Sequence, residues 1–155
     1  MKHIEVSAEG WDHRPYWRYL DTVKHEMPPH LFAFASGQEN HNLSSRNSLH
    51  DAWLEHLAIE ESVGDAQRKV QIAVRLLGPY HDRHIQLTYK NVASYSLDGF
   101  DIRTSRSPLH GDLLIHEMRI ERSGLFTHEL LFESDARFIV TFADFEHRIV
   151  LLEQT

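Results

Sequence analysis

Histidine is the residue type in this chain best suited to chemistry. The 155 residues include 13 histidines and no cysteine. Imidazole has the unperturbed pKa nearest physiological pH, and it is a common ligand of transition metals. Any acid–base or metal site is therefore expected to rest on histidines and carboxylates, whereas disulfides and thiolate-bound metals are excluded.

Three histidines in the C-terminal half are expected on one face of an antiparallel sheet. His116, His128 and His147 lie in successive runs in which apolar and polar residues alternate. One interpretation is a histidine-lined pocket that binds a divalent metal through these three residues or transfers protons. The alternative is that each imidazole lies at the rim of the core and is satisfied by a single hydrogen bond.

The register that brings these histidines together depends on the turns between the strands. We expect short loops at 122–124, 134–136 and 143–146. The first loop places His116 opposite Leu130, and the second places His128 opposite Phe142. The third brings His147 opposite Phe142 from the other side. All three histidines then point to the same face.

A second group of candidate pocket residues, His50, Asp51 and Trp53, opens the first expected strand. Ser, His and Asp occur close together in Ser48–Leu54, but a catalytic triad is defined by spatial roles and not by adjacency. No Gly-x-Ser-x-Gly turn accompanies them. We expect Trp53 in the core or at its rim, and His50 and Asp51 either in solvent or at a partner-binding edge.

The same segment carries a resemblance to a known group of proteins. His50-Asp51-Ala52, an apolar residue after it and a following run of antiparallel strands resemble small β-rich immunity proteins of bacterial polymorphic toxin systems. The resemblance covers Ser48–Leu54 and the general strand pattern, and the chain differs in its longer helical N-terminus. It implies a protein that binds and neutralises a toxin.

The elements that must position these residues form an α+β domain of ordinary size. Residues 1–36 are expected to be a helical segment, because apolar residues recur at helical spacing from Tyr16 to Met27 and Pro28-Pro29 ends that helix. Residues 37–48 are polar and rich in turn formers, which indicates a loop. From residue 49 to 155 the period of two predicts a curved, mostly antiparallel sheet or partly open barrel, with the helical segment packed on it. Its expected strands are 49–60, 70–76, 84–90, 113–121, 125–133, 137–143 and 147–153.

The distribution of charge limits the kinds of partner. The net charge is −7, and residues 1–66 hold 5 basic and 11 acidic side chains. Without a basic stripe, neither nucleic acid nor an anionic membrane is an expected partner, whereas a basic protein is. No apolar run reaches the length of a signal peptide or membrane span, so we expect a cytoplasmic protein.

The absence of known motifs sets the order of the function hypotheses. No phosphate-binding Gly-rich loop, His-Glu-x-x-His, EF-hand loop or dinucleotide fingerprint occurs, so no cofactor is expected. The leading hypothesis is a small binding protein with an unidentified partner, and the resemblance above implies that it neutralises a toxin. The alternative is a metal-dependent or acid–base enzyme that uses the histidine-lined pocket. The oligomeric state stays open.

Overall fold

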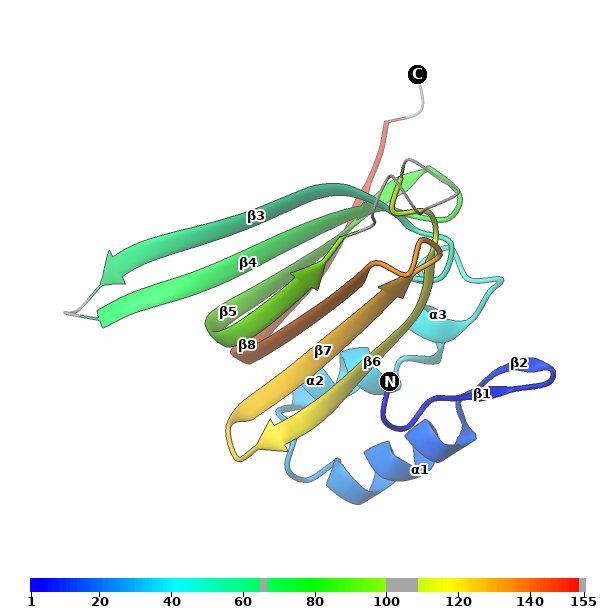
Figure 1. The fold of residues 1–155 in the computed structure, drawn as a ribbon, viewed down its shortest axis with the longest axis horizontal. Coiled ribbons are helices and arrows are strands. Elements are labelled where there is room, and N and C mark those ends of the chain that lie inside the picture. The colour runs from blue at the N-terminus through cyan, green and yellow to red at the C-terminus, as the bar shows by residue number, and fades with distance from the viewer. Residues whose placement is uncertain (65–66, 100–108, 154–155) are drawn as a thin grey trace.

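An open, six-stranded antiparallel sheet dominates the structure, which is a computed structural model that describes residues 1–64, 67–99 and 109–153 (Figure 1). The strand order is β3-β4-β5-β8-β7-β6. The α+β class with an antiparallel sheet is therefore confirmed. The strands are β3 (Trp53–Gly64), β4 (Gln67–Leu77), β5 (Arg83–Asp98), β6 (Leu113–Arg122), β7 (Leu125–Phe132) and β8 (Arg137–Leu151).

The N-terminal segment matches the expected helical segment only in part. It begins with a separate two-stranded hairpin, β1 (Glu5–Ser7) and β2 (Gly10–Asp12), before the helices start. The expected loop at 37–48 contains a further short helix. The helices are α1 (Arg14–Val23), α2 (Pro29–Ser36) and α3 (Gln38–His41), and none in the described part of the chain has the length and apolarity to cross a membrane.

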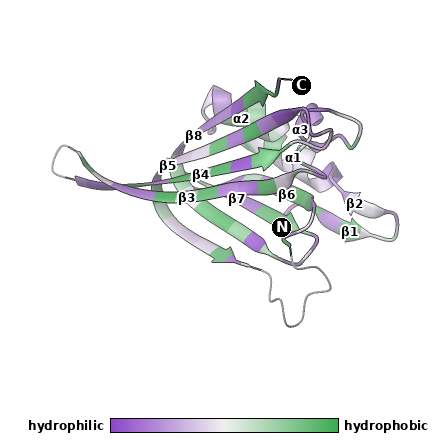
Figure 2. Ribbon diagram, turned by 90° about the horizontal axis from the view of Figure 1, so that it is seen from above, coloured by the Kyte–Doolittle hydropathy of each residue, from purple (hydrophilic) through white to green (hydrophobic). Residues whose placement is uncertain are grey.

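The core lies between α2 and one face of the sheet. Along β4 and β5 the buried residues alternate with less buried ones, as in the cross-strand pairs Val74–Leu87 and Ile72–Tyr89. Figure 2 shows the same alternation of hydrophobic and hydrophilic residues along the strands. From α2, the ring of Phe34 reaches this face and lies 4.8 Å from that of Phe145.

The opposite face of β6 and β7 is buried as well, and it holds an ion network. The Glu117 carboxylate accepts hydrogen bonds from the backbone N–H groups of residues 2–4 at 2.7–3.1 Å. Arg119 donates to Glu117 at 3.2 Å and to Glu129 at 3.0 Å. The amino group of Met1 lies 2.8 Å from Glu129. Residues 1–4 therefore lie over this face, and their amino and N–H groups donate the hydrogen bonds that the buried carboxylates need.

The register of β6 against β7 is the one predicted from the turn at residues 122–124. His116 lies opposite Leu130, and Met118 lies opposite His128. The loop between β7 and β8 is shifted by one residue from the predicted loop at 134–136. The Phe132 N–H donates to the Ala136 carbonyl at 2.9 Å, so the loop is 133–135, and Asp135 within it has φ 67°. His128 consequently faces Val140 and not Phe142.

The expected loop at 143–146 is wrong, because β8 runs through it without interruption. Phe142 and Phe145 are both buried although they differ in parity, so the buried face changes between them. The neighbouring strand β5 is irregular at the same place. Its Lys90 pairs with Asp144 and its Val92 pairs with Phe142, and Asn91 between them has φ 50°. A change of face inside one long strand leaves the same sequence pattern as two strands joined by a turn.

The start of the sheet also differs from the expectation. Strand β3 begins at Trp53, and residues 49–52 form a turn in which the Ala52 N–H donates to the Leu49 carbonyl at 3.2 Å. Asp51 in this turn has φ 63°, which is incompatible with an extended strand.

The two edges of the sheet approach each other at this turn. The Asp51 N–H donates to the Leu113 carbonyl at 2.9 Å, and the Leu113 N–H donates to the Ala52 carbonyl at 3.0 Å. A bridge between Trp53 and Asp112 follows. The edge strands β3 and β6 therefore meet at one end, and the sheet stays open along the rest of their length.

The β6 edge is covered by tyrosines of α1. The Tyr16 hydroxyl accepts a hydrogen bond from the Met118 N–H at 3.0 Å and donates to the Met118 carbonyl at 2.8 Å. The Tyr19 hydroxyl accepts from the Ile120 N–H at 2.8 Å. These hydroxyls take the place of a neighbouring strand, and they satisfy the edge where α1 buries it.

We predict that Tyr16→Phe destabilises the protein by about 1–3 kcal/mol, because it leaves the Met118 N–H and carbonyl buried without a partner. Urea unfolding followed by circular dichroism measures the change. Tyr95→Phe is the control, since that ring is 49% exposed and the variant should unfold as the wild type does. Equal stability of Tyr16→Phe and wild type would contradict the role assigned to the hydroxyl.

Candidate functional site

A chain of hydrogen bonds runs through the core from β5 to α3. The Tyr89 hydroxyl lies 2.8 Å from His128 Nδ1. His128 Nε2 lies 3.1 Å from His116 Nδ1. His116 Nε2 lies 3.3 Å from the Asn40 carbonyl. Three strands and a helix are thus joined by groups that are all buried, since Tyr89, His128 and His116 are at most 2% exposed.

The direction of every bond in this chain follows from its last member. A carbonyl only accepts, so His116 Nε2 carries the hydrogen and His116 Nδ1 is a lone-pair acceptor. His128 Nε2 must then donate to it, which leaves His128 Nδ1 to accept from the Tyr89 hydroxyl. Each neutral imidazole in the chain is therefore restricted to one tautomer.

Burial keeps these imidazoles uncharged. Desolvation lowers the pKa of His128 to about 3, and the positive charges of His41, Arg119 and His147 act in the same direction. Desolvation also lowers the pKa of His116 well below its ordinary value, with His41 and His128 adding to the effect. Burial raises the pKa of Tyr89. The chain is thus neutral throughout the physiological range.

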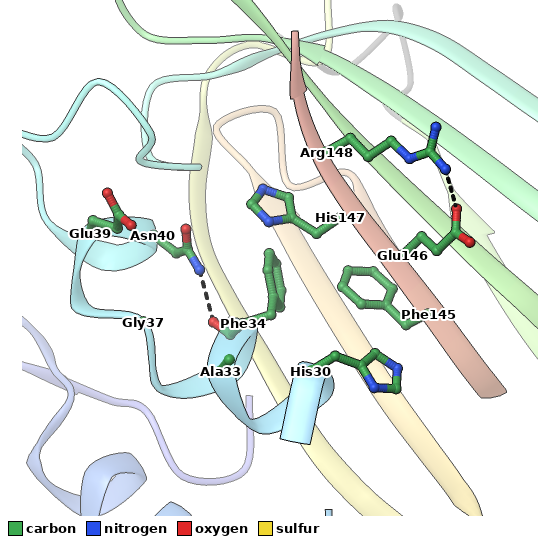
Figure 3. Close-up of a pocket in the computed structure, with 10 residues that line it drawn as sticks. All are labelled: His30, Ala33, Phe34, Gly37, Glu39, Asn40, Phe145, Glu146, His147 and Arg148. Carbon is green, nitrogen blue, oxygen red and sulfur yellow. Dashed lines mark hydrogen bonds and ion pairs between the residues drawn. The ribbon is translucent and has the colours of Figure 1, made fainter. Parts of the chain in front are cut away.

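His147 reaches the same face but stays outside the hydrogen-bonded chain. The ring of Phe34 contacts all three histidines predicted to cluster, at centroid distances of 5.7 Å from His116, 5.5 Å from His128 and 4.9 Å from His147. His147 lines a cavity of about 520 Å³ between α2, α3 and β8. Figure 3 shows it beside Phe34 and Asn40. Its Nε2 is buried without a partner, and burial lowers its pKa.

The predicted metal ligands do not surround a common point. Within the described ranges, no group of three or more His, Asp or Glu side chains has the arrangement of a metal site. The facing nitrogens of His116 and His128 are already bonded to each other. In this arrangement the two imidazoles serve each other as hydrogen-bond partners.

A second cavity, of about 450 Å³, opens where the chain of hydrogen bonds ends, and we call it the histidine-lined cavity. Four imidazoles border it, those of His13, His41, His50 and His116. The ring of His41 is stacked on that of His116, with the centroids 4.1 Å apart. The ring of His13 contacts the ring of His41 edge-on, at a centroid distance of 5.4 Å. Burial lowers the pKa of His41 to about 4 and also lowers that of His13.

The candidate residues His50, Asp51 and Trp53 lie around the turn before β3, and they do not share one pocket. His50 borders the histidine-lined cavity, and its Nδ1 lies 2.7 Å from an Asp51 carboxylate oxygen. Trp53 is 47% exposed and its indole donates to Asp112, so it lies at the rim and not in the core. Only His50 joins the histidines described above.

Sequence reasoning missed His13, His41 and Tyr89. For Tyr89 a signal exists, because it continues the buried alternation of Ile85 and Leu87 and a buried tyrosine hydroxyl needs a partner. His13 and His41 lie in connecting segments without periodicity. Their positions depend on long-range packing, which no local pattern reveals.

Comparisons of the chain with protein-family models, with curated proteins and with solved structures found no match. The site is therefore interpreted from its own geometry.

We predict that the melting temperature falls between about pH 7.5 and pH 5.5. Histidines with lowered folded pKa values bind protons more readily when unfolded, so their stabilisation is complete above the unfolded pKa of 6.5 and is lost as the pH falls toward the folded values. Each fully buried histidine of this kind loses roughly 1.4 kcal/mol over this range. His128→Gln should reduce the slope, as measured by thermal unfolding across the pH series. A flat or rising profile would contradict the buried neutral chain.

Proposed function

We propose that this protein is an interaction protein and that its partner, a basic protein, adds an extended segment to the β3 edge of the sheet. The observation that carries the proposal is the difference between the two edges. Tyrosine hydroxyls of α1 cover the β6 edge. Beyond Trp53, the outer edge of β3 makes no backbone hydrogen bond within the described residues.

An uncovered edge strand presents a row of backbone donors and acceptors that another chain can pair with. Strand β3 is 12 residues long, and its pairing with β4 continues beyond the last β4–β5 pair, at Ile72. Figure 1 shows this hairpin end extending away from the helices. Apolar side chains stand exposed on it, with Ile59 at 42% and Val63 at 78%. Exposed apolar side chains beside an unpaired strand edge are typical of a surface that binds another protein.

The charge of β3 favours a basic segment. Its acidic residues are Glu55, Glu60 and Glu61, and it contains no lysine or arginine. Glu55 is paired with Arg75 and His84, and Glu60 and Glu61 are exposed. Together with the net charge of −7, these carboxylates would accelerate encounter with a positively charged partner.

The geometry supports binding more than acid–base catalysis. A general acid or base works best with a pKa near the operating pH. Burial moves the pKa of His128 to about 3 and that of His41 to about 4. These two imidazoles are therefore weak bases, and their burial in the core favours a structural role for them over proton transfer.

The test uses a photo-crosslinking amino acid placed at position 59 of the full chain in its source cell, and at position 150 as the control. Ile59 and Val150 are matched in exposure, at 42% and 41%, but Val150 lies away from the β3 edge, on β8, where it pairs with His84 of β5. We expect a basic protein to be captured from position 59 alone. Capture of the same proteins from both positions would count against the β3 edge.

The captured partner then allows a quantitative prediction. Ile59→Lys and Val63→Lys place like charges against a basic segment and should weaken binding by about tenfold or more, ~1.4 kcal/mol, in calorimetric titration. Val150→Lys should bind as the wild type does. Unchanged affinity of both β3 variants would overturn the proposal.

Toxin neutralisation is the narrower form of this proposal, supported by the resemblance of Ser48–Leu54 to the immunity proteins. Expression of the captured partner alone should arrest growth, and co-expression of wild-type chain should restore it. The Ile59→Lys chain should restore growth less well. A partner without toxicity would exclude neutralisation and leave the β3 interaction in place.

A further inference from the structure

Strand β8 has an unpaired edge over the second half of its length. Its pairing with β7 ends at Phe142, whereas its pairing with β5 continues to Leu151. On the side away from β5, the backbone of residues 143–151 makes no backbone hydrogen bond within the described residues. The sheet thus has an unpaired edge here as well as at β3, although β8 lies between β5 and β7 in the strand order.

The hydrogen-bond pattern of the ladder identifies the backbone groups that point out of this edge. In an antiparallel pair, residues bonded to the neighbouring strand alternate with residues whose N–H and carbonyl point the other way. The Leu152 N–H donates to the Asp82 carbonyl at 2.9 Å, and the register continues from there along β8. In steps of two residues, Arg148 is bonded to β5. The backbone groups of His147 and Ile149, on either side of it, therefore point away from β5.

The cavity of about 520 Å³ lies along this edge, and we call it the β8 cavity. A cavity against one face of a strand is lined by every second residue. The consecutive residues 145–148 all line this one, as expected at a strand edge. Figure 3 shows β8 on one side of the β8 cavity, and α2 and α3 with Ala33 and Glu39 on the other.

One carboxylate of this lining has no cation beside it within the described chain. Glu146 and Arg148 form an ion pair at 3.3 Å. Glu39 accepts a hydrogen bond from the Asn47 side chain at 2.9 Å and forms no ion pair. Burial lowers the pKa of His147, and the charge of the nearby Glu39 acts in the opposite direction. The charge of Glu39 therefore reaches across the β8 cavity and suits a basic side chain there.

We propose that the β8 cavity binds an extended segment of another protein that carries a basic side chain. The segment would pair as an added strand with the outward N–H and carbonyl of His147, and its basic side chain would lie against Glu39. In this mode of recognition, main-chain hydrogen bonds give affinity and side-chain contacts give specificity. A strand of four residues spans about 13 Å, which matches the length of residues 145–148. The site is separate from the β3 edge and does not depend on the function proposed for that edge.

The test begins with the selection of short random peptides, displayed on phage, that bind the full chain. We expect enriched peptides with a lysine or arginine among apolar residues, and dissociation constants of about 100 μM or below in calorimetric titration. Ala33 is exposed on α2 and lines the β8 cavity. Ala33→Phe therefore fills the cavity without removing a core contact, and it should weaken peptide binding by about tenfold or more.

Matched variants separate the cavity from general effects of substitution. Ala93→Phe is the control, because Ala93 is also exposed but lies on β5 outside the lining, and this variant should bind as the wild type does. Glu39→Gln removes the charge and should weaken binding by about threefold or more, with a larger effect at low salt. Thermal unfolding checks that each variant is folded. Should Ala33→Phe fail to fold, Glu39→Gln decides.

Pairing through the backbone leaves a signature in the peptide itself. N-methylation removes one peptide N–H at a time, and bonded residues alternate with residues that point outward. Binding should therefore fall by about tenfold or more at every second position and change little at the positions between. Equal losses at all positions, or no loss at any, would overturn strand addition.

One variant at each edge distinguishes this site from the β3 edge. Peptides bound in the β8 cavity should respond to Ala33→Phe and not to Ile59→Lys. Peptides that respond to Ile59→Lys alone, or the absence of any enriched peptide, would overturn the β8 site and leave the crosslinking result at position 59 unaffected. Val150 remains a valid crosslinking control, because it lies beyond the cavity lining and on the face of β8 opposite His147.

Discussion

The chain of hydrogen bonds from Tyr89 through His128 and His116 to the Asn40 carbonyl is the interaction on which the rest of the structure depends. It joins β5, β7, β6 and α3 across the core, and the direction of each hydrogen bond is fixed by the bond that follows it toward Asn40. Because the last acceptor is a carbonyl, no member can reverse its direction or gain a proton without leaving a buried polar atom unsatisfied. This chain of hydrogen bonds thus fixes the position of α3 on the sheet more specifically than apolar contacts alone would.

A consequence is that β6 and β7 need cover on both faces and along one edge. The face opposite the histidines buries Glu117, Arg119 and Glu129. The backbone N–H groups of residues 2–4 donate to Glu117, and the amino group of Met1 donates to Glu129. Tyr16 of α1 satisfies the outer edge. The N-terminal third of the chain therefore completes the polar bonding of two strands more than 100 residues away, as the separations of these pairs show.

Local patterns predicted those parts of the fold that local chemistry decides. The turn before Leu125 and the parity of the apolar residues gave the pairing of His116 with Leu130 correctly. The pattern failed at β8, because Asn91 on the neighbouring strand marks a change of face that looks like a turn in the sequence. It also failed for the site, of which it found His116 and His128 but not His41. That residue is placed by a stack on His116, a contact between positions with no shared periodicity.

The turn between residues 48 and 52 connects the histidine-lined cavity with the β3 edge. On one side it carries His50 to the histidine-lined cavity, and on the other it starts β3 at Trp53. Its conformation is held by the Asp51 N–H on the Leu113 carbonyl and by the left-handed backbone of Asp51. The backbone hydrogen bonds of this turn therefore position both one wall of the cavity and the start of β3.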